Sequence, residues 1–142
     1  MSDRGAPTST AEQFVAAIAW GEHTTVWDLL SSDARLAVLG VATRRGMDAL
    51  LSARLREGTA STDERDDFLA DLLHGLQSEL LGLELETLRF VRGGTGSTLP
   101  GSVVVLLVID VPAELGELVP VARMELVKEP DRWSVVRLDA IR

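Results

Sequence analysis

Four charged residues near the end of the chain have the spacing of a small polar site on a β-hairpin. Arg123 and Glu125 lie two residues apart in one apolar stretch, and Arg137 and Asp139 lie two residues apart in the next. Alternate residues of a strand share a face, so a hairpin that turns at residues 129–132 brings all four onto one face. In a pocket the aspartate would act as a base, with an arginine holding it ionised. The alternative is a solvated sheet face with ion pairs worth about 0–1 kcal/mol each.

Two further aspartates are candidates for the same chemistry. Asp110 ends the apolar run Val103–Ile109. It is either a buried base at the end of a strand or the first residue of a turn before Pro112. Asp28 follows Trp27 in a short predicted helix and faces either a cavity or solvent. If the chain is an enzyme, its catalytic residues are therefore expected among Asp28, Asp110, Arg123, Arg137 and Asp139.

The residue types that are missing exclude several other chemistries. The chain has no Cys and no Tyr, and His23 and His74 are its only histidines. Thiolate nucleophiles, disulfides and cysteine zinc sites are thus excluded, and no phenol can donate a proton. The histidines lack the spacing of a helical metal motif, and the glycines at 93–96 lack the Gly-Lys-Ser/Thr sequence of a P-loop. We expect neither a metal nor another cofactor.

The charge and hydropathy of the chain narrow the range of partners. A net charge of −8 repels phosphate backbones and anionic membranes, so neither nucleic acid nor a membrane is an expected partner. The longest apolar run, Val103–Ile109, has the length of a strand, whereas a membrane span needs about 18 residues. The segment Met1–Pro7 has no apolar core of a secretory signal. We therefore expect a cytoplasmic protein.

The elements that must position these residues form one α+β domain, with N-terminal helices packed on a C-terminal four-stranded antiparallel sheet. The 142 residues fit a disordered tail at 1–8 and one folded domain at 9–142. Capping boxes at Ser9–Glu12 and Ser61–Glu64, apolar periodicity and glycines predict helices at 9–20, 26–30, 33–45, 47–57 and 61–81. The last helix carries an apolar stripe that includes Phe68, Leu72 and Leu76, and we expect this stripe to be core. Alternation predicts strands at 83–90, 103–109, 119–128 and 133–139, and the second of these is apolar on both faces.

Two side-chain orientations follow from the same periods. The helical period directs Leu36 and Leu39 toward the core. Strict alternation in the last strand puts Val136 and Leu138 on one face, and Val135 with Arg137 on the other.

Two segments of the chain resemble nuclear transport factor 2-like domains. After a break at Trp20–Glu22, the segment Leu29–Arg35 reads Leu-Leu-Ser-Ser-Asp-Ala-Arg and is similar to a recurring "L-L-S-x-D-A-R" segment of that family. The segment Met124–Val136 resembles the closing hairpin of the family, in which a Trp follows a charged turn. The middle of the chain departs from the pattern, because residues 33–81 are almost wholly helical in character where typical members place a strand or hairpin.

The resemblance implies a curved sheet around a long helix, often with a conical pocket, and a homodimer formed through the sheet. Members include polyketide cyclase-like enzymes, ketosteroid isomerases, epoxide hydrolases and non-catalytic modules, so the fold assigns no function by itself. One hypothesis is a non-catalytic dimer that binds a small apolar ligand or a protein partner. Another is a small cofactor-free isomerase, cyclase or hydrolase, since epoxide-hydrolase-like members use Asp and Arg together. A third is an unrelated helical bundle packed on a four-stranded meander.

Overall fold

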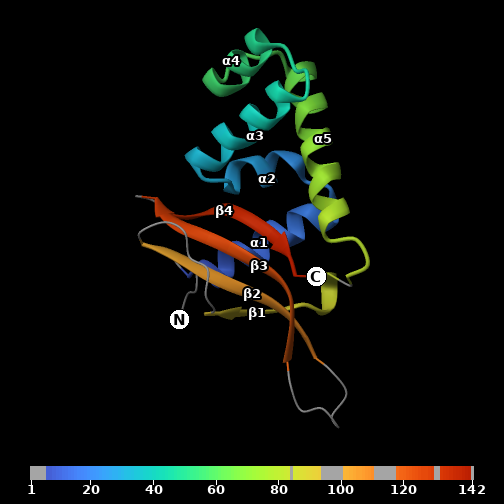
Figure 1. The fold of residues 1–142 in the computed structure, drawn as a ribbon, viewed down its shortest axis with the longest axis vertical. Coiled ribbons are helices and arrows are strands. Elements are labelled where there is room, and N and C mark those ends of the chain that lie inside the picture. Colours follow the sequence, from blue (N-terminus) through green and yellow to red (C-terminus); the bar gives the residue numbers. More distant parts are fainter. Residues whose placement is uncertain (1–5, 84, 94–100, 111–117, 130–131, 142) are drawn as a thin grey trace.

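The computed structural model describes residues 6–83, 85–93, 101–110, 118–129 and 132–141, without the side chains of Glu86, Asp110 and Leu118. Within these ranges, five α-helices precede one four-stranded antiparallel sheet, which is the predicted α+β arrangement (Figure 1). The helices are α1 (Pro7–Trp20), α2 (His23–Leu29), α3 (Ser32–Arg44), α4 (Ala49–Glu57) and α5 (Thr62–Glu79). A short 3-10 helix, η1 (Leu85–Thr87), leads to strands β1 (Arg89–Arg92), β2 (Ser102–Asp110), β3 (Leu118–Glu129) and β4 (Arg132–Ala140).

Side-chain caps start three of the helices. The predicted capping box of α5 is present: the Ser61 hydroxyl accepts from the Glu64 amide at 3.2 Å, and the Glu64 carboxylate accepts from the Ser61 amide at 3.1 Å. Ser31 caps α3 through the amide of Ala34. Asp48 caps α4 through the amide of Leu50.

The first helix begins earlier than predicted. Helix α1 starts at Pro7, and its N-terminal neighbour Ala6 makes no side-chain cap, so the assignment of Ser9 as the cap was wrong. Proline suits the first helical position because the amide it lacks would have no partner there. Pro7 and Thr8 are therefore helical, and of the predicted tail at 1–8, residues 1–5 lie outside the described residues.

The sheet is a meander with the strand order β1-β2-β3-β4. The prediction that its first strand begins at Leu83 was wrong: residues 85–87 form the 3-10 turn, and pairing begins at Arg89. Leu83 and Leu85 each pack against the core, although they are not part of a strand. Their spacing of two in the sequence therefore looked like the alternation of a strand.

A bulge in the last hairpin reverses the orientation of Val135. Glu125 pairs with Arg137 and Leu126 pairs with Val135, which leaves Val136 as an extra residue in β4. Val135 consequently turns into the core and is fully buried. The prediction that it shares a face with Arg137 was wrong, because strict alternation holds only where the two strands stay in register.

The core lies between the sheet and the first two helices. Helix α1 packs on β1, β2 and β4, and α2 packs on α1 and α5. Val105 and Leu107 of β2 face this core, while Val104 and Val108 are buried on the opposite face, so this strand is covered on both faces as predicted. Helices α3 and α4 and the first half of α5 project away from the sheet (Figure 1).

The projecting helices leave several apolar side chains at the surface. Leu39 is buried as predicted, but the prediction for Leu36 was wrong: it is 49% exposed, because it borders an open cavity beside α3. In the described part of the chain, no helix combines the length and the apolar character that crossing a bilayer requires.

Candidate ligand-binding groove

The four charged residues of the last hairpin meet on one face, as their spacing predicts. Arg123 pairs with Asp139 and Glu125 with Arg137 in the register of β3 and β4. The Arg137 Nε lies 3.3 Å from Asp139 Oδ2 and 3.5 Å from Glu125 Oε1. The Arg123 Nη2 lies 4.0 Å from the same Asp139 oxygen. These contacts make a ladder of ion pairs across the outer face of the sheet.

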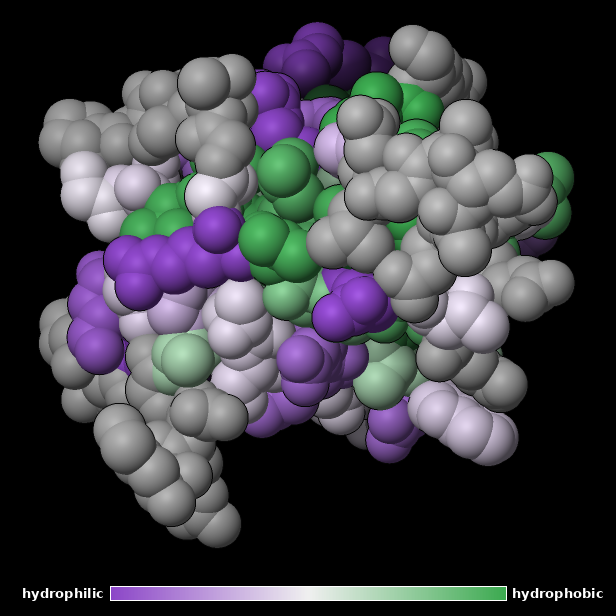
Figure 2. All heavy atoms as spheres, turned by 90° about the horizontal axis from the view of Figure 1, so that it is seen from below, coloured by the Kyte–Doolittle hydropathy of each residue, from purple (hydrophilic) through white to green (hydrophobic). Residues whose placement is uncertain are grey.

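Glu125 is the buried acid of this ladder. Its side chain is 1% exposed, and Ser102 Oγ donates to its Oε2 at 2.7 Å. Asp139, the aspartate predicted to act as a base, is instead 51% exposed. A carboxylate that is both buried and paired stabilises the sheet only while its partners remain in place. Figure 2 views the molecule from the end at which the sheet lies, and charged and apolar side chains adjoin on that face.

Of the two remaining candidates, Asp28 does not join this ladder. Asp28 is exposed on α2, and its backbone carbonyl accepts hydrogen bonds from the side chains of Arg35 and Arg132. Asp110 pairs with Leu118 at the end of β2, and its side chain lies outside the described residues. Of the five predicted site residues, Arg123, Arg137 and Asp139 therefore lie together, and Asp28 lies apart from them.

A large open hollow lies among the projecting helices. It is a groove of about 750 Å³ between α5 on one side and α3 and α4 on the other, and we call it the α3–α5 groove. Its lining residues are Ala37, Val38, Val41, Ala42, Arg45, Met47, Leu51, Glu64, Asp67, Phe68, Asp71, Leu72, Gly75 and Leu76.

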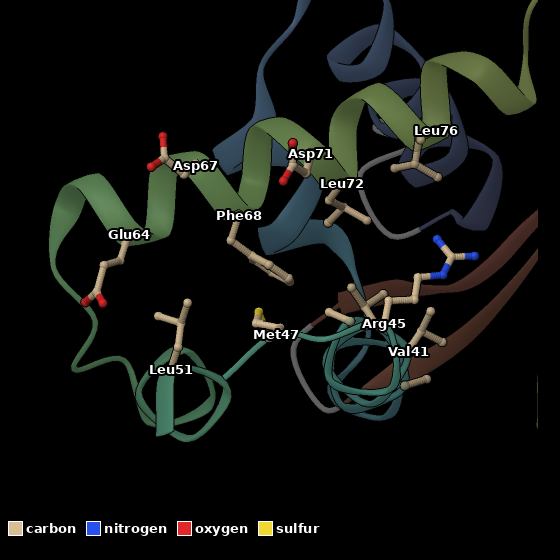
Figure 3. Close-up of a pocket in the computed structure, with 14 residues that line it drawn as sticks. Val41, Arg45, Met47, Leu51, Glu64, Asp67, Phe68, Asp71, Leu72 and Leu76 are labelled. Carbon is tan, nitrogen blue, oxygen red and sulfur yellow. The ribbon is translucent and has the colours of Figure 1, made fainter. Parts of the chain in front are cut away.

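The walls of the α3–α5 groove are apolar. Phe68, Leu72 and Leu76 repeat every fourth residue along α5 and point across the groove (Figure 3). Met47, Leu51 and Val41 face them from the opposite side. Such a spacing puts the three α5 side chains on one stripe of the helix. The stripe was predicted as core, and these three side chains are partly buried against the core while they also border the groove.

Charged residues lie at the edges of the α3–α5 groove. Asp67 and Asp71 lie one turn apart on α5, and Arg45 extends from the α3 side (Figure 3). At the end of the groove, Arg54 Nη2 lies 2.6 Å from Glu64 Oε2 and ties α4 to α5. The hydrogen bond from Arg54, together with the one from the Ser61 amide, holds the pKa of Glu64 below its usual value.

Gly75 is an unusual component of this wall. It lies inside α5 with ordinary helical geometry, and a Cβ added to it would meet no atom within 4 Å. A glycine in a helix interior costs about 1 kcal/mol relative to alanine. No packing among the described residues requires its small size.

A second cavity, of about 690 Å³, lies on the other side of Phe68. Trp27 contacts Phe68 edge to face, with ring centroids 5.5 Å apart, and Arg35 lies 5.6 Å over the Trp27 ring. The Arg35 Nε also donates to the Trp27 carbonyl at 3.0 Å. Asp28 borders this cavity, and the side chain of Arg35 there holds α2 against α3 through the carbonyls of Trp27 and Asp28.

The chemistry of the α3–α5 groove suits binding. Its lining includes no histidine, hydroxyl or lysine, and its three acids, Glu64, Asp67 and Asp71, lie along the edge formed by α5. Over the described ranges of the chain, no group of three or more His, Asp or Glu side chains is placed to hold a metal ion. What the groove presents is apolar surface with acidic residues at one edge.

Comparisons of this chain with protein-family models, with curated proteins and with solved structures find no match. Its function must therefore be argued from its own geometry.

Proposed function

We propose that this chain is a non-catalytic binding module and that the α3–α5 groove is its binding site. The observation that carries the proposal is a mainly apolar hollow of about 750 Å³ whose lining holds no histidine, hydroxyl or lysine. Ligand sites are usually apolar clefts of about 300–1,000 Å³ with a few polar groups. In this proposal the charged ladder of β3 and β4 stabilises the sheet, since none of its residues borders the groove.

We also propose that the fold is of the nuclear transport factor 2-like kind and that the chain forms a homodimer through the outer face of its sheet. Helices followed by a four-stranded antiparallel meander support the first part. A cross-sheet row supports the second: Val91 pairs with Leu106, Leu106 with Arg123, and Arg123 with Asp139. Val91 and Leu106 form the apolar half of this row, which a two-fold related copy could bury against the same half of its own sheet.

The neutral dye Nile red tests the binding site. We expect its fluorescence to rise on binding to the intact chain, with saturation at micromolar protein. The variant Gly75→Leu should fill the groove from its wall, because the added side chain meets no atom at its Cβ. We expect it to weaken dye binding at least about tenfold, since the apolar surface is no longer accessible.

Two matched variants control this experiment. Gly75→Ala adds one methyl group at the same position and should leave most dye binding intact. Gly40→Leu makes the same change within α3, at a residue outside the groove, and should not affect binding. Circular dichroism should show equal helix content in all three. Equal dye binding by Gly75→Leu and the parent chain would reject the groove as the binding site.

A further inference from the structure

The shape of the α3–α5 groove matches a helix. Its α5 wall runs from Glu64 to Leu76. At about 1.5 Å of rise per residue, this wall is about 18 Å long, or roughly three turns. Its apolar side chains, Phe68, Leu72 and Leu76, are spaced four apart. A helical occupant that presents apolar residues at i, i+4 and i+7 would interdigitate with such a wall.

The charges at the edges of the groove predict which charges this helical occupant carries on each of its flanks. Asp67 and Asp71 form no ion pair with another described residue, whereas Glu64 is already paired with Arg54. The α5 edge of the groove is therefore negative, within a chain whose net charge is −8. Basic residues on the occupant would be favoured along this edge. Arg45 on the opposite edge favours an acidic residue on the other flank of the same helix.

Gly75 explains how closely the occupant can approach. The glycine exposes the backbone of α5 at the groove wall, with no described atom within 4 Å of a Cβ placed there. Ala37 and Ala42 are small residues on the α3 side. Small residues allow the backbone of a second helix to come near, and glycine is used where a partner approaches the backbone. The cost of glycine within α5 is then offset in the complex.

We propose that the α3–α5 groove binds an amphipathic helix of a partner protein, with basic side chains along the flank that faces Asp67 and Asp71. This proposal rests on the proposed function, in which the groove is the binding site. It names the class of ligand: a helical peptide segment of about three turns with an apolar face and a basic edge.

A displayed library of helix-forming 16-residue peptides tests the proposal with the full chain as bait. Counter-selection against Gly75→Leu removes basic peptides that adhere anywhere to an acidic protein. We expect the surviving peptides to be amphipathic, to carry Lys or Arg on one flank, and to bind with micromolar Kd. Binding should weaken with added salt, because opposite charges are screened.

A charge pair of variants then locates the basic edge. Asp71→Asn should weaken the selected peptides about threefold to tenfold. Glu12→Gln removes the same charge from α1, away from the groove, and should leave their Kd within about twofold. Selected peptides that are neutral or acidic, or that bind Asp71→Asn and the parent chain equally, would overturn the proposed ligand class.

The dye experiment separates the two proposals. If no peptide survives counter-selection while Nile red binding still depends on Gly75, the groove is a site for small apolar ligands and the helix proposal is wrong. If the dye binding is also insensitive to Gly75→Leu, the proposed function fails together with it.

Discussion

Glu125 shows what a single charged residue contributes in this sheet. Its carboxylate is buried, and it contacts Arg137 and Ser102 on neighbouring strands. Asp139 contacts the same arginine from the surface and is half exposed. The carboxylates of Glu125 and Asp139 thus share the guanidinium of Arg137, but the buried Glu125 has lost more of its contact with water than Asp139 has. Removing their common partner should affect the buried one far more.

The variant Arg137→Gln tests this difference. We expect it to lower the free energy of unfolding by about 1–3 kcal/mol, because a buried carboxylate loses a charged partner. Asp139→Asn keeps the shape of the exposed acid and should cost less than about 1 kcal/mol, as surface ion pairs do. Urea unfolding followed by tryptophan fluorescence measures both. An equal loss of unfolding free energy in the two variants would contradict this expectation. It would show that the burial of Glu125 does not increase the contribution of its contact with Arg137.

At the scale of elements, helix α4 is attached to α5 by few polar contacts. The Arg54–Glu64 pair, at 2.6 Å, joins them at one end of the α3–α5 groove. Glu64 is also part of the capping box of α5. Its carboxylate therefore has two tasks: it accepts from the Ser61 amide and it holds the arginine of the neighbouring helix.

The two tasks of Glu64 can be separated by pH. The pKa of Glu64 is held below its ordinary 4.5, chiefly by the hydrogen bond from Arg54, so the unfolded chain binds this proton more tightly than the folded chain. Its contribution to stability is complete above that value and is lost as the pH falls through the lower folded pKa. Glu64→Gln keeps a capping side chain but has no charge. The parent chain should be more stable than this variant at about pH 7, and the difference should shrink toward about pH 3.

Urea midpoints of both proteins across this pH range provide the measurement. Asp67→Asn is the matched control, because Asp67 is a neighbouring acid of α5 whose carboxylate has no ion-pair partner among the described residues. Its difference from the parent chain should change less with pH. A Glu64→Gln difference that stays constant down to the lowest pH would contradict a stabilising Arg54–Glu64 pair.

The sequence predicted the helices and strands better than it predicted how these elements pack against one another. Helix starts such as Ser61 were predictable, because the capping residues are local to the helix they begin. The charged ladder was predictable because Arg123 and Asp139 lie on either side of one short turn. The bulge at Val136 was not, since register depends on two strands together. The groove was not predictable either. The position of Leu72 in the apolar stripe of α5 is the same whether α3 and α4 pack directly against it or leave a groove between them.

At the scale of the whole molecule, the outer sheet face is the surface with which a second copy would have to pair. Val91 is 41% exposed at its apolar end. We expect Val91→Glu to shift a dimer toward monomer by at least about tenfold in Kd, because it puts a charge against apolar surface in the partner. Leu50→Glu makes a similar change on α4, where Leu50 is 69% exposed, and should leave the association unchanged. Sedimentation equilibrium distinguishes the two, and a parent chain that is monomeric at micromolar concentration would refute the dimer.

The packing of α1 on β4 has a consequence for how the protein is made. The first helix lies against the last strand, and Ser31, which follows the second helix, donates its amide to Val135 of that strand at 2.8 Å. During synthesis on a ribosome, the helices emerge long before this strand does. Their apolar faces therefore stay exposed to solvent until the residues of β4 have been translated. We expect a chain arrested before β4 to be a substrate for chaperones and proteases, even though every helix is already present in it.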